Sequence, residues 1–129
     1  MLLGELEKQV LEYLWENQTA DAKQVYSHFE KSRGGTLNTI QSTLERLVKK
    51  NILNRVKNGH AYQYYPKVAR QELIALLIKD VTHDFVKTDE NSIIAAFSSL
   101  SSDLDEQQLD KLEAMIEQQR LKLQQEPTK

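Results

Sequence analysis

The stretch TLNTIQSTLERLVKKNILNRVKNGHAYQYY, residues 36–65, decides the fold of this 129-residue chain. Its first half carries apolar residues at helical spacing, and its second half alternates like two strands around Asn58-Gly59. An Asn-Gly pair is a strong hairpin signal, because a type I′ turn needs positive φ at both central residues. Thr36 predicts an N-cap for the helix, and Asn51 predicts a left-handed C-cap that ends it. We therefore expect a helix, a stop and a two-stranded hairpin.

Two further helices are expected ahead of this stretch. Apolar residues at helical spacing predict a first helix over Leu3–Glu16, with Trp15 as a core anchor. Asp21 predicts the N-cap of a second helix, and Gln24 three residues later completes a capping box. A Gly-Gly pair then predicts the turn that leads into the third helix. Three helices followed by a hairpin are typical of a winged helix-turn-helix, which the sequence predicts over residues 1–66.

Charge is divided unevenly along the chain, although the net charge is only −2. Residues 1–66 carry nine Lys/Arg against seven Asp/Glu, whereas residues 67–129 carry eight against twelve. Within residues 31–57 there are seven basic residues and one acid. A local cationic cluster of this kind is what a phosphate-binding surface requires, and the average over the whole chain hides it. The sequence therefore predicts contact with a polyanion.

The third helix and the hairpin together predict a DNA-binding surface. The first two turns of such a helix reach base edges in the major groove, where short hydrogen-bonding side chains are needed. The residues expected to read bases are Asn38, Thr39, Gln41, Ser42 and Arg46. Those expected at phosphates or the minor groove are Lys49, Lys50, Arg55, Lys57, Asn58 and His60, and the capping residue Thr36 completes the set.

The sequence after Pro66 predicts helices only, over about 69–86, 89–100 and 105–123. These helices carry more apolar surface than they can hide alone, and burial is worth about 25 cal/mol per Å². Pairing with a second copy would bury that surface, and a two-fold dimer would set two recognition helices roughly 34 Å apart, one turn of DNA. We therefore expect residues 67–129 to dimerise through Leu73, Leu77, Val81, Phe85, Leu109, Leu112 and Ile116.

Other classes of protein find little support. The chain has no cysteine, which excludes disulfides, thiolate metal sites and cysteine nucleophiles. Its three histidines are scattered, and it has no Gly-rich phosphate loop, so neither an enzyme nor a metal or cofactor site is expected. No apolar run approaches the roughly 20 residues of a membrane span, and no signal peptide is evident, so we expect a cytoplasmic protein. Two alternatives stay open: a ligand-controlled winged-helix regulator of another family, and a winged helix that contacts only proteins.

The sequence resembles the penicillinase-repressor family of bacterial transcriptional regulators (BlaI/MecI/CopY type). The likeness is carried by LGELEKQVLEYLW (residues 3–15), QVYSHF (24–29), TLNTIQSTLERLVKKNIL (36–53) and VKNGHAYQYYP (56–66). It is nearly continuous through the predicted winged helix and weaker beyond it. The resemblance implies a homodimeric repressor in which residues 1–66 bind double-stranded DNA at a palindromic operator and residues 67–129 dimerise.

The resemblance also implies a switch. In the antibiotic-resistance members, a membrane metallopeptidase sensor system triggers cleavage of the dimerisation half between an asparagine and a phenylalanine. That position corresponds to Ala96 and Phe97, so the phenylalanine is present and the asparagine is not. A plain core role is the alternative for Phe97. The copper regulators of the family sense copper through C-terminal cysteines, which this chain lacks, so no cofactor is expected.

Overall fold

The structure is a computed structural model that describes residues 2–85 and 90–125, without the side chains of residues 84, 85 and 90–93. Its contacts divide the chain into two compact units, Met1–Val81 and Thr82–Lys129. We call them the N-terminal unit and the C-terminal unit. Each has its own set of elements, and each is described separately below.

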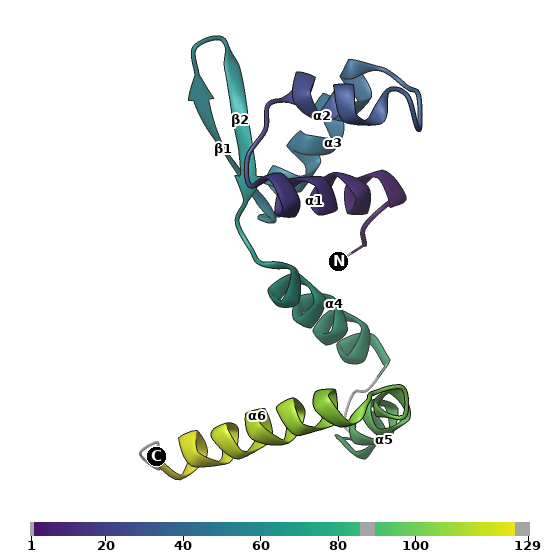
Figure 1. Cartoon of the computed structure of the whole chain (residues 1–129), viewed down its shortest axis with the longest axis vertical. Coiled ribbons are helices and arrows are strands. Elements are labelled where there is room, and N and C mark those ends of the chain that lie inside the picture. The colour runs from purple at the N-terminus through teal and green to yellow at the C-terminus, as the bar shows by residue number, and fades with distance from the viewer. Residues whose placement is uncertain (1, 86–89, 126–129) are drawn as a thin grey trace. The chain divides into compact units, whose positions relative to one another are not determined.

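The N-terminal unit is a winged helix-turn-helix, as the sequence predicts. Its elements are α1 (Glu5–Asn17), α2 (Ala22–Phe29), α3 (Leu37–Lys49), β1 (Leu53–Asn58), β2 (Ala61–Pro66) and the first turns of α4 (Arg70–Phe85). The two strands form one antiparallel sheet, and Figure 1 shows the three helices gathered beside this hairpin. Fold class, mainly α with a small β-hairpin, is therefore confirmed.

The first two helices begin at residues that satisfy their free amides. The helix predicted from Leu3 begins two residues later, because the Gly4 amide donates to the Glu7 carboxylate at 3.0 Å and ends the extended segment there. The predicted capping box of α2 is present. The Gln24 amide donates to the Asp21 carboxylate at 2.8 Å, and the Asp21 amide donates to the Gln24 side chain at 2.8 Å.

Both predicted caps of α3 are present. The Thr39 amide donates to the Thr36 hydroxyl at 3.2 Å, which fixes the start of the helix. At the other end Asn51 has a φ of 63°, the left-handed conformation that asparagine tolerates. Its amide donates to the Val48 carbonyl, and the amide of the next residue donates to the Leu47 carbonyl, both at 3.0 Å. This pair of bonds is a Schellman motif, and it turns the chain from α3 into β1.

The hairpin turn lies one residue later than predicted. Asn58 pairs with Ala61 in the strand register, so the two central turn residues are Gly59 and His60. Gly59 has a φ of 69°, and neither Asn58 nor His60 has a positive φ. One positive φ at the first central position is the pattern of a type II′ turn. The predicted type I′ turn is therefore wrong, because glycine at the first position already supplies the only left-handed residue that the turn needs.

The core of the N-terminal unit gathers apolar side chains from every one of its elements. Leu14 of α1, Leu44 of α3 and Leu53 of β1 are almost completely buried. The predicted core anchor Trp15 lies instead at the margin of this core, partly buried and packed against it. The indole ring is apolar but carries one N–H donor, which explains this position. Its Nε1 donates to the Val68 carbonyl at 3.0 Å.

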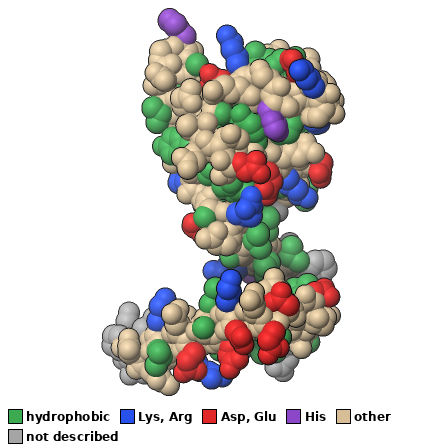
Figure 2. Space-filling view, viewed as in Figure 1, with side chains coloured by type: hydrophobic (Ala, Val, Ile, Leu, Met, Phe, Trp, Pro, Cys, Tyr) green, Lys and Arg blue, Asp and Glu red, His purple; other side chains and the backbone are tan. Residues whose placement is uncertain are grey.

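The C-terminal unit contains the end of α4, α5 (Glu90–Ser101) and α6 (Glu106–Gln125). No residue of α6 is buried, and acidic side chains gather on its visible face (Figure 2). The large apolar side chains that stay exposed on α5 and α6 are Ile94, Phe97, Leu100, Leu109, Met115, Ile116, Leu121 and Leu123. Among the helices that the structure describes, none is both long and apolar enough to cross a membrane.

The N-terminal unit extends past the domain boundary expected at residue 66. Leu73, on the first turns of α4, is only 3% exposed and belongs to the winged-helix core, and Leu77 packs against that core one turn later. The compact unit accordingly ends at Val81. Whether DNA binding and dimerisation divide at residue 66 stays a prediction, because contacts alone do not assign either activity to a segment.

Truncating Leu44 tests the core. Leu44 is fully buried in α3, so we expect Leu44→Ala to lower the free energy of unfolding by about 2–5 kcal/mol through lost apolar burial and a residual cavity. Urea denaturation followed by circular dichroism measures the change. The control is Leu2→Ala, where the side chain is 86% exposed and a change within about 0.5 kcal/mol is expected. Equal effects of the two substitutions would contradict this packing.

Candidate nucleic-acid interface

One side of α3 presents polar side chains that the fold does not use. Asn38, Gln41 and Ser42 are all exposed, and their spacing of three and four residues places them on one face of the helix. Within the described part of the chain, none of these three side chains has a hydrogen-bond partner. The amide and hydroxyl groups there remain available to an external molecule.

Three other residues predicted to face DNA also serve the helix itself. The Thr36 and Thr39 hydroxyls lie 3.1 Å apart within the N-terminal cap. The Arg46 guanidinium donates to the Thr43 hydroxyl at 3.1 Å, and that hydroxyl donates to the Thr39 carbonyl at 2.8 Å. Thr36, Thr39 and Arg46 are all exposed. They lie on the predicted surface, but some of their polar groups already have hydrogen-bond partners within the fold.

The tip of the hairpin carries exposed polar and cationic groups. Lys57, Asn58 and His60 are exposed at the turn, and their side chains form no hydrogen bond or ion pair with any described residue. Lys49 is exposed on the last turn of α3, where its charge acts on the nearby Glu45 carboxylate. The structure thus places exposed cations at the end of α3 and at the tip of the wing.

Arg55, predicted to contact a phosphate, is instead paired within the fold. Its guanidinium donates to the Glu45 carboxylate of α3 and lies over the Tyr62 ring, 4.3 Å from the ring centroid. The Tyr64 hydroxyl donates to the same carboxylate at 2.6 Å. We call Glu45, Arg55, Tyr62 and Tyr64 the helix–wing cluster. It connects α3 to both strands, so it fixes the wing relative to α3.

The helix–wing cluster changes the acidity of its members. Burial raises the pKa of Glu45, but hydrogen bonds from Tyr64 and Arg55 outweigh it and hold the pKa below the ordinary value of 4.5. Burial and the hydrogen bond to Glu45 raise the pKa of Tyr64 from 10.0 to about 12. The carboxylate is therefore ionised and the phenol protonated at neutral pH, which is the arrangement that the two hydrogen bonds require.

Lys50, also predicted at a phosphate, has internal partners as well. Its ammonium donates to the Glu7 carboxylate and to the Leu2 carbonyl, each at 2.8 Å. Burial raises the pKa of Glu7, but bonds from Lys50 and from the Gly4 amide outweigh it, so this pKa is lowered. Lys50 thereby ties the end of α3 to the segment that precedes α1.

The carboxylate partners of Arg55 and Lys50 were not predicted from the sequence. Glu7 lies 43 positions before Lys50, and no local pattern connects them. Glu45 did offer a signal, because it is the one acid within residues 31–57. A single carboxylate inside a cationic cluster has several cations within reach, and pairing is the simplest way to keep it partly buried.

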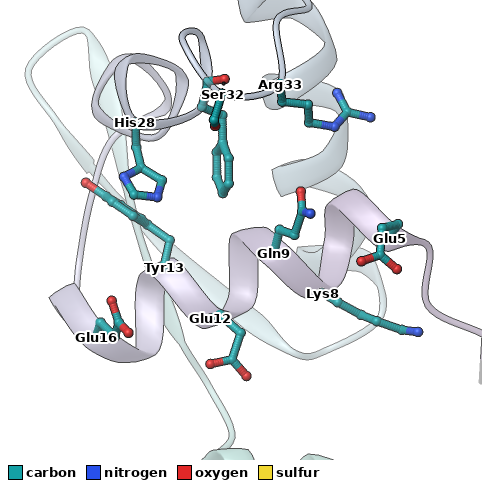
Figure 3. A pocket seen from close by; sticks show the side chains of 10 residues that line it. Glu5, Lys8, Gln9, Glu12, Tyr13, Glu16, His28, Ser32 and Arg33 are labelled. Carbon is teal, nitrogen blue, oxygen red and sulfur yellow. Dashed lines mark hydrogen bonds between the residues drawn. The ribbon is translucent and has the colours of Figure 1, made fainter.

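A hollow of about 600 Å³ between α1 and α2 bears on the ligand-controlled alternative. Figure 3 shows Tyr13 and His28 turned toward each other across it, with ring centroids 4.5 Å apart. Five of its ten lining residues carry a formal charge: Glu5, Lys8, Glu12, Glu16 and Arg33. Pockets for small ligands are mostly apolar with few polar groups, and this hollow does not match that description.

The predicted dimerisation residues fall into three groups. Leu73 lies inside the N-terminal core, and Leu77 packs partly buried against it, so Leu73 is not available to a partner. Val81, Leu109 and Ile116 are exposed, and Leu112 is partly buried. The side chain of Phe85 lies outside the described residues.

At the predicted cleavage position, Ala96 and Phe97 are both exposed on α5. No group of His, Asp or Glu that could hold a metal ion occurs among the described residues.

Known proteins resemble this chain in sequence and in fold. The family model described as penicillinase repressor matches residues 3–118. The transcriptional regulator BlaI of Mycobacterium tuberculosis is 33% identical over 79 residues, covering 60% of this chain and 57% of that protein. The penicillinase repressor of Bacillus licheniformis is 25% identical over 95 residues, or 74% of each chain. The solution structure of the DNA binding domain of the repressor BlaI has a TM-score of 0.50 at 27% identity, covering 54% of this chain and 85% of that one.

The N-terminal unit defines the class, a winged helix-turn-helix protein with further helices attached. The chain belongs to the penicillinase repressor family, because the family model matches most of the 129-residue chain. The resemblance found in the sequence is thereby confirmed. The family is one of repressors, which are not enzymes, in agreement with the expectation from sequence. The chain spans just over half, 57%, of the length of the M. tuberculosis relative.

The free energy of unfolding, measured between acidic and neutral pH, tests the helix–wing cluster. Because the pKa of Glu45 is lowered in the folded state, its ionised form stabilises the fold above about pH 4.5, and this contribution is lost as the pH falls through the folded-state pKa. We expect Glu45→Gln to unfold more easily than the natural chain at pH 7, and the difference to shrink below pH 4.5. Urea denaturation between acidic and neutral pH measures it.

The matched control for this experiment is Glu30→Gln. Glu30 is exposed at the end of α2, and its side chain has no hydrogen-bond partner among the described residues. Its replacement should leave the difference small at every pH. A Glu45→Gln deficit that stays constant between neutral and acidic pH would contradict an ionised carboxylate at the centre of the cluster.

Proposed function

We propose that this chain is a sequence-specific DNA-binding transcriptional repressor that acts in the cytoplasm as a homodimer on a palindromic operator. The observation that carries the proposal is the polar face of α3, where Asn38, Gln41 and Ser42 are exposed without internal partners. Exposed cations at the end of α3 (Lys49) and at the wing tip (Lys57) support it. Membership of the penicillinase repressor family supports the same function.

In this proposal α3 enters the major groove with its first two turns against base edges. Gln41 can bind adenine through its amide, which offers a donor and an acceptor side by side. The wing tip, with Lys57 and His60, reaches the phosphate backbone or the minor groove. Lys50 and Arg55 act indirectly, because their charges hold α3 and the wing in place rather than binding DNA.

We place the dimer interface on the C-terminal unit. Apolar side chains on α5 and α6 stay exposed in one chain, and they line a hollow of about 340 Å³ beside Phe97, Leu112 and Met115. A second copy would bury this surface, and a two-fold arrangement presents two α3 helices to two half-sites. The proposed interface includes Leu109, Leu112 and Ile116 but not Leu73, which is buried in its own chain.

Salt dependence tests DNA binding, with a palindromic duplex selected by the natural chain from a random library as the probe. If about six phosphate contacts form, affinity should fall roughly 10³-fold or more between about 50 and 200 mM salt.

Two substitutions separate base reading from phosphate contact. Gln41→Ala should weaken binding by about 1–3 kcal/mol and relax the preference at one base pair, whereas Lys57→Ala should weaken binding to all DNA sequences alike and reduce the salt slope by about one. Fluorescence anisotropy measures both. An affinity that does not respond to salt would overturn the proposal.

A charge placed on α6 tests the dimer. Ile116 is 46% exposed in one chain, and we expect Ile116→Asp to yield a monomer because the carboxylate would be buried unpaired in the interface. Sedimentation velocity measures the mass. Gln118→Asp, at an exposed polar position on the opposite side of the same helix, is the control and should remain dimeric. A dimeric Ile116→Asp chain would rule out this interface.

We further propose that proteolysis between Ala96 and Phe97, through a membrane metallopeptidase sensor system, releases the repressor. Both residues are exposed on α5, which supports access, and the peptide lies within a helix, so that helix must open before a protease can bind it extended. Mass spectrometry of the chain from its native cells, before and after exposure to a β-lactam, tests this step. Regulation by a small ligand bound in the α5–α6 hollow is the alternative, and it leaves the chain intact.

A further inference from the structure

The segment that joins the wing to α4, residues 67–69, is held by several backbone hydrogen bonds. The Tyr64 and Ala20 backbones exchange two hydrogen bonds, at 2.8 and 3.1 Å, just ahead of this segment. The Lys67 amide then donates to the Ile52 carbonyl at 2.8 Å. The Val68 carbonyl accepts from the Trp15 indole at 3.0 Å. Residues 67–69 therefore form a fixed connection instead of a free tether.

The start of α4 is attached to α1 by side chains. The Arg70 guanidinium donates through Nε to one Glu12 carboxylate oxygen at 3.2 Å and through a second nitrogen to the other. The same guanidinium lies over the Trp15 ring, 5.2 Å from its centroid. Figure 3 shows that Glu12 points away from α2. Two parallel hydrogen bonds define the direction of a guanidinium better than a single ionic contact does.

The first turns of α4 are also anchored through the core. The Ala69 amide donates to the Glu72 carboxylate at 3.2 Å, which caps the helix where the fixed connection ends. Leu73 is 3% exposed inside the winged-helix core, and Leu77 packs against the core one turn later. Three kinds of contact, from backbone, ionic and apolar groups, thus act on the same short segment.

We infer that Glu12, Trp15 and Arg70 are positioning residues that dock α4 on the winged helix and thereby set the half-site spacing that the dimer accepts. This inference rests on the proposed function, because it assigns these residues a part in reading a two-site operator. The physical reason is geometric. A helix docked along its first two turns leaves the winged helix in one direction, so each recognition surface is held at a defined angle to its own α4. A free tether would let each half adapt to many spacings.

The sole tryptophan reports on the docking without DNA. In Arg70→Ala the ion pair and the stacked guanidinium are lost, so the Trp15 emission should shift to longer wavelength and acrylamide should quench it more strongly. The matched control is Arg120→Ala on α6, which also removes an exposed arginine paired with a glutamate but lies outside the N-terminal unit. The control should match the natural chain. Identical emission and quenching in Arg70→Ala and in the natural chain would overturn the docking.

Spacing of half-sites tests the positioning role. The probes are the selected palindromic duplex, the same duplex with five base pairs inserted between its half-sites, and a duplex with one half-site. Five base pairs turn one half-site by about half a helical turn, so the natural chain should strongly prefer the original spacing. In the double variant Trp15→Phe, Arg70→Ala we expect this preference to fall about tenfold, equivalent to about 1.4 kcal/mol. Phenylalanine keeps the apolar contact and removes only the indole donor.

Binding to the single half-site separates the possible outcomes. An affinity within about twofold of the natural chain, a change of less than 0.5 kcal/mol, would show that the winged helix of the double variant is folded and reads DNA normally. A spacing preference equal to that of the natural chain would overturn the inference. A half-site affinity that falls as much as the palindrome affinity would also overturn it, because these residues would then belong to the DNA-reading surface. If the natural chain selects no duplex, the proposed function fails, and the positioning role fails with it, whatever the fluorescence shows.

Discussion

The burial of one side of α3 is the contact on which the other features of the N-terminal unit depend. Ile40, Leu44 and Leu47 are turned into the core. Asn38, Gln41 and Ser42 are exposed, and their side chains have no partner among the described residues. The helix cannot rotate to bury these polar side chains without exposing its leucines, at about 25 cal/mol for each Å² of apolar surface. Core packing therefore determines which side chains face outward, although none of the outward residues takes part in it.

Local patterns in the sequence account for most of the fold. Asp21 and Thr36 predict helix starts because their side chains bond amides only three residues away, and Asn51 predicts a stop through its own backbone conformation. The hairpin turn was placed one residue early because Asn58-Gly59 and Gly59-His60 both contain the glycine that such a turn needs. Strand register decides between them, and register depends on cross-strand pairing along the hairpin.

The exposure of Asn38, Gln41 and Ser42 was predictable for the same reason, since helical spacing alone places them on one face. The internal partners of the cations were not predictable. Lys50 and Arg55 differ from Lys57 only in having carboxylates nearby, and those carboxylates come from other elements of the fold. Charge counted along a sequence gives the composition of a surface. It does not show which of the charges are neutralised within the fold.

The contact between Lys50 and the Leu2 carbonyl also bears on how the protein is handled. This carbonyl belongs to the segment ahead of α1, and the lysine that binds it is the residue that directly follows α3. A peptide fused ahead of Leu2 would crowd an ammonium group that stabilises α3. An affinity tag is therefore better joined after α6, far along the chain from this lysine, and a tag at the front should be removed before DNA affinity is measured.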